Sequence, residues 1–288
     1  QAFVWRYALG WHATLEEAHT LSLTDRAFGE VVHQLLQYTV VTLENGTGLA
    51  RAAVHEVENA LSQATERVAR QWPAMRPTPP PMLWRHTLEE AARLALAALR
   101  LDEFKPGTRS WTEVPFGEAG ATGTLPWDPE PKILIPGTRL AIRGRIDRVE
   151  IAAGDTAVRV TDYKTASAPG NVQALILDGG KELQRALYSI AARHHMTDAA
   201  LHADLVYLGD ETPRRHKLQD PEAAMTRVGE LLNLATALLE RGVSLPGPDD
   251  EERWNRYRLA RPAVGEPTAR KGAIDEAFGT FRQVWRER

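Results

Sequence analysis

The segment from residue 144 to residue 164 constrains the fold more than any other part of the chain. It reads GRIDRVEIAAGDTAVRVTDYK, in which two runs of alternating apolar and polar residues flank the turn signal Gly154-Asp155. Such runs predict two half-buried strands. Because antiparallel strands can be joined by a connection this short, we expect the segment to form a β-hairpin.

Three charged residues lie toward one end of this predicted hairpin. Side chains two apart on a strand share a face, so Asp162 and Lys164 point the same way, and the hairpin can bring Asp147 beside them. Taken singly, each is more often a solvated or salt-bridged surface charge. Together, two carboxylates and an ammonium can hold a divalent cation and a phosphate. They indicate metal-assisted phosphodiester hydrolysis, with Mg²⁺ or Mn²⁺ as the cation. Lys164 would position or activate the water, or stabilise charge in the transition state.

The rest of the chain alternates between helical and strand patterns around this segment. Helices are expected at residues 1–12, 24–40 (with Thr24 or Asp25 as the N-cap), 48–71, 84–104, 181–195 and 220–242. Strands are expected at residues 111–116, 132–135, 138–152, 157–164 and 203–208. This order predicts an α/β fold, in which a mixed central β-sheet is flanked by helices and carries helical N- and C-terminal additions.

The amino-acid composition excludes several kinds of site, and the net charge bears on possible binding partners. The chain has no cysteine, which excludes disulfides, thiolate zinc sites and a four-cysteine iron–sulfur cluster within it. The net charge of −3 gives no support for nucleic-acid binding. A local basic channel remains open, and so does a merely solvated face, because basic residues cluster at Arg139, Arg143, Arg145 and Arg148 and at Arg214, Arg215 and Lys217.

The sequence gives no sign of membrane insertion or export. It has no apolar run near the roughly 18 residues of a membrane span and does not open on a signal-peptide pattern, so we expect a cytoplasmic protein. It begins at Gln1 in an aromatic, apolar segment. That opening suggests a fragment cut from a longer polypeptide, with processing as the alternative, and we expect the fragment to form one compact domain.

Two further groups are candidates for a site. Gln184 and Tyr188 are four apart and share a helical face. They can face the strands, with Gln184 bonding a phosphate or metal-bound water and Tyr188 contacting the backbone or bracing Lys164. In the alternative, Tyr188 is core and Gln184 is solvated. His33 lies beside an apolar stripe, where a histidine is more often a core residue than a ligand. Since the chain has no HExxH or HxxxH spacing, nothing supports a zinc hydrolase.

Taken in order, four short motifs resemble the PD-(D/E)XK nuclease superfamily in its RecB/AddB-like branch. The motifs are Gly29–His33, Gly144–Glu150, Asp162–Thr165 and Gln184–Tyr188. Each is weak alone, but the ordered combination over about residues 25–210 is highly specific. The resemblance implies a restriction-endonuclease-like core at residues 106–210, between a helical part at 1–105 that carries the histidine and a helical tail at 211–288.

The resemblance also implies roles for individual residues. His33, Asp147 and Asp162 would bind the metal, together with the main-chain carbonyl of Tyr163. Lys164 would be the catalytic lysine, supported by Gln184 and Tyr188, and Glu113 could orient the site. The implied activity is that of a Mg²⁺- or Mn²⁺-dependent DNA nuclease, acting on single-stranded or unwound ends beside a helicase. Such a nuclease would serve in DNA-end processing, repair, recombination or phage defence, as an exonuclease or an endonuclease.

One departure from this branch is the missing cysteines. Many relatives hold an iron–sulfur cluster with four of them, so here no iron–sulfur cluster is expected. The tail would instead dock through aromatic packing by Trp254, Tyr257, Phe278, Phe281 and Trp285. Two rival interpretations remain. One is a catalytically inactive DNA-binding module of a helicase–nuclease complex, and the other is a structural α/β domain whose motifs are accidental.

Overall fold

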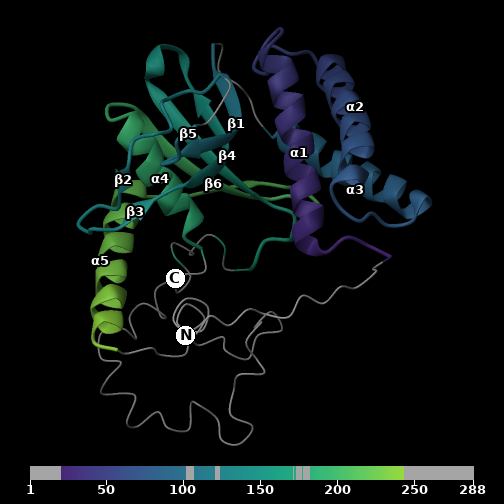
Figure 1. The fold of residues 1–288 in the computed structure, drawn as a ribbon. Helices are drawn as coiled ribbons and strands as arrows, with labels where there is room; N and C mark the ends of the chain where they lie inside the picture. Colours follow the sequence, from purple (N-terminus) through teal and green to yellow (C-terminus); the bar gives the residue numbers. More distant parts are fainter. Residues whose placement is uncertain are drawn as a thin grey trace, which may run out of the picture.

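The computed structural model describes residues 21–101, 107–120, 124–170, 172, 177 and 182–242. At its centre is a five-stranded sheet with the order β1-β4-β5-β6-β7 (Figure 1). The strands are β1 (Arg109–Phe116), β4 (Gly144–Ile151), β5 (Ala157–Lys164), β6 (Ala200–Tyr207) and β7 (Arg215–Lys217). Only β5 and β6 pair in parallel, and helix α4 (Gln184–His195) forms the crossover between them.

Helices cover both faces of this sheet. The helices α1 (Asp25–Glu44), α2 (Val54–Gln71) and α3 (Pro81–Arg100) form a group on one side, seen at the right of Figure 1. Helix α5 (Pro221–Glu240) packs with α4. On β5, Val160 belongs to the apolar core that includes α4, whereas Tyr163 belongs to the core of α1–α3. Since alternate residues of a strand face opposite sides, the two helix groups lie on opposite faces.

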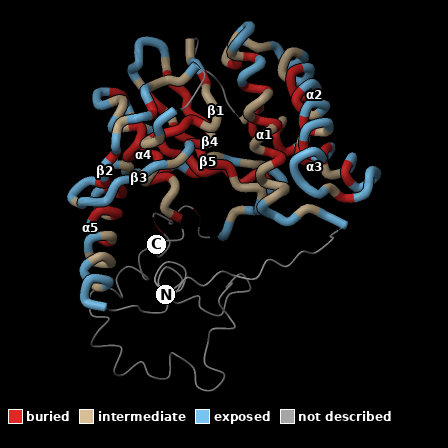
Figure 2. The backbone as a smooth tube through the Cα atoms, viewed as in Figure 1, coloured by how far each residue is buried: buried red, intermediate tan, exposed pale blue. Residues whose placement is uncertain are grey.

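Burial follows the same three layers. In Figure 2 the buried residues gather along the sheet strands and on the helix sides turned toward them. Helix α1 illustrates the local cause: Thr24 Oγ1 accepts from the backbone N–H of Ala27 at 3.2 Å, which caps its N-terminus. From there Val31, Val32 and Leu35 recur at helical spacing and are fully buried.

The mixed, helix-flanked sheet confirms the expected α/β fold, and the expected hairpin is present. Residues 148–151 of β4 pair antiparallel with residues 158–161 of β5. The turn between them holds Gly154 and Asp155 at positive φ values of 71° and 56°. The strand pattern expected at 138–152 is broken instead into β3 (Ala141–Ile142), which pairs with β2 (Ile133–Leu134), and β4.

Three other expectations need correction. The helix expected from residue 48 begins at Val54, and β7 was not expected at all, because its Arg215-His-Lys sequence suggested a charged surface. Arg148 and Arg215 are neither a channel nor a solvated face: their side chains are 1% and 12% exposed and paired with carboxylates. Pairing with β6 forms β7, and ion pairs bury the two arginines. Neither kind of contact is visible in the local composition of the sequence.

Some expectations fall outside the part of the chain that the structure describes. These are the helix at residues 1–12 and the aromatic tail residues Trp254, Tyr257, Phe278, Phe281 and Trp285. The three-part division of the chain stays a prediction. Among the helices of the described ranges, none is long and apolar enough to cross a membrane.

Candidate active site

The site begins where β4 and β5 part. Their ladder ends at the pair Arg148–Thr161, so the residues of β5 that follow Thr161, including Tyr163, have no ladder partner on β4. Asp147 fills this position with its side chain: Oδ2 accepts from the backbone N–H of Tyr163 at 2.9 Å. The separation of two strands thus places a carboxylate in the opening between them, while satisfying a backbone donor that the ladder leaves over.

A chain of hydrogen bonds links this carboxylate to the lysine. Tyr188, on α4, donates its hydroxyl to Asp147 Oδ1 at 3.2 Å, and Gln184 Nε2 donates to that hydroxyl at 3.4 Å. Lys164 Nζ donates to Gln184 Oε1 and lies 2.8 Å from Asp162 Oδ2. The structure therefore brings together these five sequence candidates. Tyr188 braces Asp147, however, and it is Gln184 that contacts Lys164.

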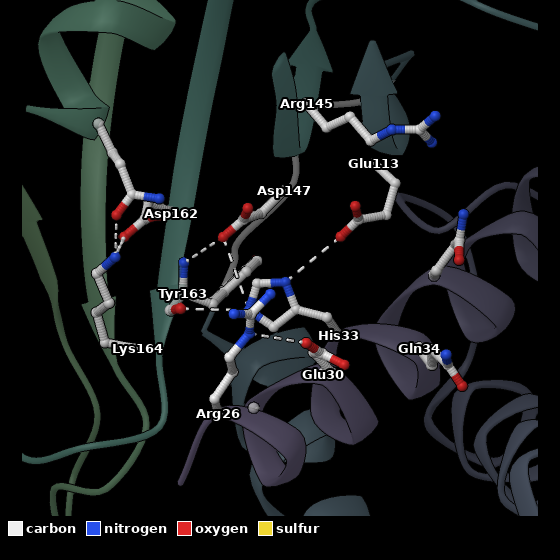
Figure 3. Close-up of a pocket in the computed structure, with 13 residues that line it drawn as sticks. Arg26, Glu30, His33, Gln34, Glu113, Arg145, Asp147, Asp162, Tyr163 and Lys164 are labelled. Atoms are coloured by element: carbon white, nitrogen blue, oxygen red, sulfur yellow. Dashed lines mark hydrogen bonds and ion pairs between the residues drawn. The ribbon is translucent and has the colours of Figure 1, made fainter. Parts of the chain in front are cut away.

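His33 completes the site from the opposite side of the opening. Its Nε2 lies 3.3 Å from the carbonyl oxygen of Tyr163 and 3.8 Å from Asp147 Oδ2, and its Nδ1 lies 3.4 Å from Glu113 Oε1. In Figure 3, Asp147 stands between the pair Asp162–Lys164 and the pair His33–Glu113. Four elements, α1, β1, β4 and β5, thus each present a polar group to one point.

Glu113 has an unusual backbone conformation for a non-glycine residue. Its φ is +51°, within an otherwise regular edge strand. Non-glycine residues held in this region cost on the order of 1–3 kcal/mol and tend to occur at functional sites. Here the local twist turns the carboxylate toward His33, so that one ligand atom each from His33, Glu113 and Asp147 lies within 4.8 Å of the others.

The site concentrates negative charge away from water, and the pKa values reflect this. Burial and the neighbouring charge of Asp147 raise the pKa of Asp162 to about 7, against the opposing effect of Lys164. Burial also raises the pKa of Asp147. Although burial disfavours the imidazolium, the carboxylates of Glu113 and Asp147 outweigh it and raise the pKa of His33 to about 9. The arrangement therefore favours bound positive charge.

The site opens into a cavity of about 560 Å³. The site residues that line this cavity are His33, Glu113, Asp147, Asp162, Tyr163, Lys164 and Gln184, but not Tyr188. Its rim is polar. On that rim Glu30 pairs with Arg26 at 3.1 Å and with Arg76. Arg145, whose side chain is 56% exposed, stands on the β4 side of the mouth (Figure 3). A polar substrate can therefore reach the carboxylates from solvent.

Sequence reasoning missed Glu182. Helical periodicity had placed it on a different side from Gln184, but α4 begins only at Gln184, so that periodicity does not apply to it. The residue is 8% exposed, and burial together with the charge of Asp162 raises its pKa, while Lys164 and Arg185 act in the other direction. Only its position immediately before a motif helix could have drawn attention to it.

Comparison with known proteins agrees with this geometry. A family model described as the PD-(D/E)XK nuclease superfamily matches residues 2–276, which is nearly the whole chain. No curated protein matches it. The mixed sheet and the acidic residues and lysine where β4 and β5 separate agree with the family match. This chain therefore belongs to the PD-(D/E)XK nuclease superfamily.

Proposed function

We propose that this protein is a divalent-metal-dependent DNA nuclease that hydrolyses phosphodiester bonds. The observation that carries the proposal is the meeting of Asp147, Asp162 and Lys164 at the parting of β4 and β5, beside His33 and within an open cavity. Family membership alone would be compatible with an inactive relative. A complete set of acidic residues and a lysine, linked by an ion pair and a chain of hydrogen bonds, favours an active one.

The donor set suits a hard divalent cation. Carboxylate and carbonyl oxygens with one imidazole match the preferences of Mg²⁺ and Mn²⁺. We assign the ligands as His33, Asp147, Asp162 and the main-chain carbonyl of Tyr163. Glu113 orients His33, and the ligand atoms that the structure brings within 4.8 Å of one another are those of His33, Glu113 and Asp147, without Asp162. When bound, such a cation polarises the phosphate and lowers the pKa of a bound water.

The surroundings of Lys164 suggest how it acts. Burial disfavours the ammonium, but its ion pair with Asp162 outweighs burial and raises the pKa of Lys164, so the side chain stays charged at neutral pH. A charged lysine cannot take a proton from water. Lys164 therefore stabilises the negative charge that develops on the phosphate, and Gln184 and Tyr188 fix its direction relative to Asp147.

For the biological setting we propose the RecB/AddB-like branch. The four ordered motifs support this branch. Membership in it implies single-stranded or unwound DNA ends as the substrate, a helicase partner and a cytoplasmic location. DNA-end processing in repair, recombination or phage defence would be the role.

The decisive experiment is cleavage of labelled single- and double-stranded DNA in Mn²⁺, Mg²⁺ or EDTA. We expect cutting with either metal, a preference for single strands, and none in EDTA. Circular dichroism in EDTA should show a folded protein, because apolar cores on both faces of the sheet stabilise the described fold. If DNA binds tightly but is cut under no condition, the chain is an inactive DNA-binding module instead.

A further inference from the structure

A second set of buried charged residues lies on the sheet face opposite Asp162 and Lys164. We call it the charge cluster; its members are Arg148, Glu150, Arg159, Asp204 and Arg215. Two carboxylates lie among three guanidinium groups. The closest pairs are Arg148–Glu150 at 3.0 Å and Arg215–Asp204 at 3.1 Å. Hydrogen bonds to Ser110 and Thr161 extend the cluster over all five strands.

The charge cluster reaches the active site through the side chain of Tyr163. Arg148 Nη1 donates to the Tyr163 hydroxyl at 3.1 Å, while Arg148 Nη2 is held by Glu150 and Ser110. The guanidinium is only 1% exposed, so its position is fixed on several sides. Because an arginine presents several donors in a rigid plane, holding Nη2 on two acceptors restricts the direction in which Nη1 donates to Tyr163.

The main chain of Tyr163 belongs to the site. Its N–H donates to Asp147, and its carbonyl oxygen lies 3.3 Å from His33 Nε2. The ring also meets the His33 ring edge to face, with centroids 6.4 Å apart. Both backbone groups point into the opening between β4 and β5, where the ladder has ended. On that side, the ladder does not hold Tyr163 in place.

We propose that Arg148 is a positioning residue for the metal site and acts through the hydroxyl of Tyr163. The buried guanidinium holds the tyrosine ring, and the ring sets the direction of the Tyr163 carbonyl relative to Asp147 and His33. The charge cluster thus ties β5 to β4 again beyond the last ladder pair. This inference rests on the proposed metal-dependent function and adds a residue that touches neither metal nor DNA.

The test deletes one oxygen atom. Tyr163→Phe keeps the ring and the backbone but removes the group that Arg148 holds. We expect Mn²⁺ binding, followed by electron paramagnetic resonance of free Mn²⁺, to weaken about 10-fold, which is typical when an outer partner of a metal ligand is lost. The Mn²⁺ concentration for half-maximal cleavage should rise equally, with little change in the rate at saturating metal.

Two further variants separate positioning from folding. Tyr38→Phe removes a tyrosine hydroxyl that contacts Gln71 on α2 instead, and should leave Mn²⁺ affinity unchanged. Arg148→Lys keeps the charge but not the planar donors. When Arg148→Lys is added to Tyr163→Phe, Mn²⁺ binding should weaken little further, because both substitutions break the same contact between Arg148 and the Tyr163 hydroxyl.

The outcomes distinguish this inference from the function on which it rests. If the wild-type protein binds Mn²⁺ and cuts DNA, and Tyr163→Phe binds Mn²⁺ equally well, the positioning role is wrong and the nuclease stands. If Tyr163→Phe lowers only the melting temperature, its role is purely structural and the inference again fails. If the wild-type protein neither binds Mn²⁺ nor cuts DNA, both fall.

Discussion

One sheet carries two groups of charges, the active-site group at the opening between β4 and β5 and the charge cluster across its strands, and their balance differs. The active-site group has three carboxylates, Glu113, Asp147 and Asp162, against Lys164 and His33. The charge cluster has two carboxylates, Glu150 and Asp204, against three arginines. Only the first opens into the 560 Å³ cavity.

The difference shows how one fold distinguishes a set of charges suited to binding a cation from a set that is paired within the protein. Buried charges are costly unless they are paired. In the charge cluster arginines pair with both carboxylates, and positive charges outnumber negative ones by three to two. In the active site, burial and the neighbouring charge of Asp147 raise the pKa of Asp162 to about 7, so added positive charge is favoured. That imbalance is what a cation site requires.

The largest effect should come from removing the one lysine of the active-site group. Lys164→Ala should lower the cleavage rate by about 100- to 1,000-fold, because a preorganised positive charge beside the phosphate is lost. The circular dichroism spectrum should stay that of the wild type. The matched control is Lys217→Ala, an exposed lysine on β7. Wild-type cleavage by the Lys164 variant would end the proposed mechanism.

A large effect of a different kind is expected in the charge cluster. Asp204→Asn removes the charge that faces Arg215 and Arg159, and breaking a buried pair this way should cost about 3 kcal/mol of unfolding free energy. Urea unfolding measures it, with the exposed Asp198→Asn as control. Activity per folded molecule should stay within a few-fold of the wild type. Unchanged stability would mean that the cluster is not structural.

An effect of the opposite sign sharpens the contrast. Asp162→Asn should stabilise the metal-free protein at pH 8, because the folded state disfavours this carboxylate's charge. The pKa is raised from 3.8 to about 7 on folding. The gain should therefore vanish below pH 4 and grow as the pH rises to 7. Urea unfolding in EDTA at pH 4 and pH 8 tests this, and equal gains at both pH values would contradict it.

Local sequence was sufficient for much of the fold. Alternation around Gly154 predicted the hairpin, and Thr24 predicted the start of α1, because both depend on neighbours along the chain. It failed for β7, a strand of three residues that exists only because β6 offers it an edge. The same limit hid the burial of Arg148, whose partners lie on other strands.

The sequence by itself determined which residues have suitable chemistry for the site. Period-two alternation put Asp162 and Lys164 on one face of β5, and the ordered motifs added His33, Asp147, Gln184 and Tyr188. Tertiary structure alone decided how they meet. The parting of β4 from β5, the positive φ of Glu113 and the link from Arg148 to Tyr163 all depend on contacts between distant segments. A sequence pattern records the direction of a side chain, whereas the balance of buried charge around it is set only when the strands and helices pack.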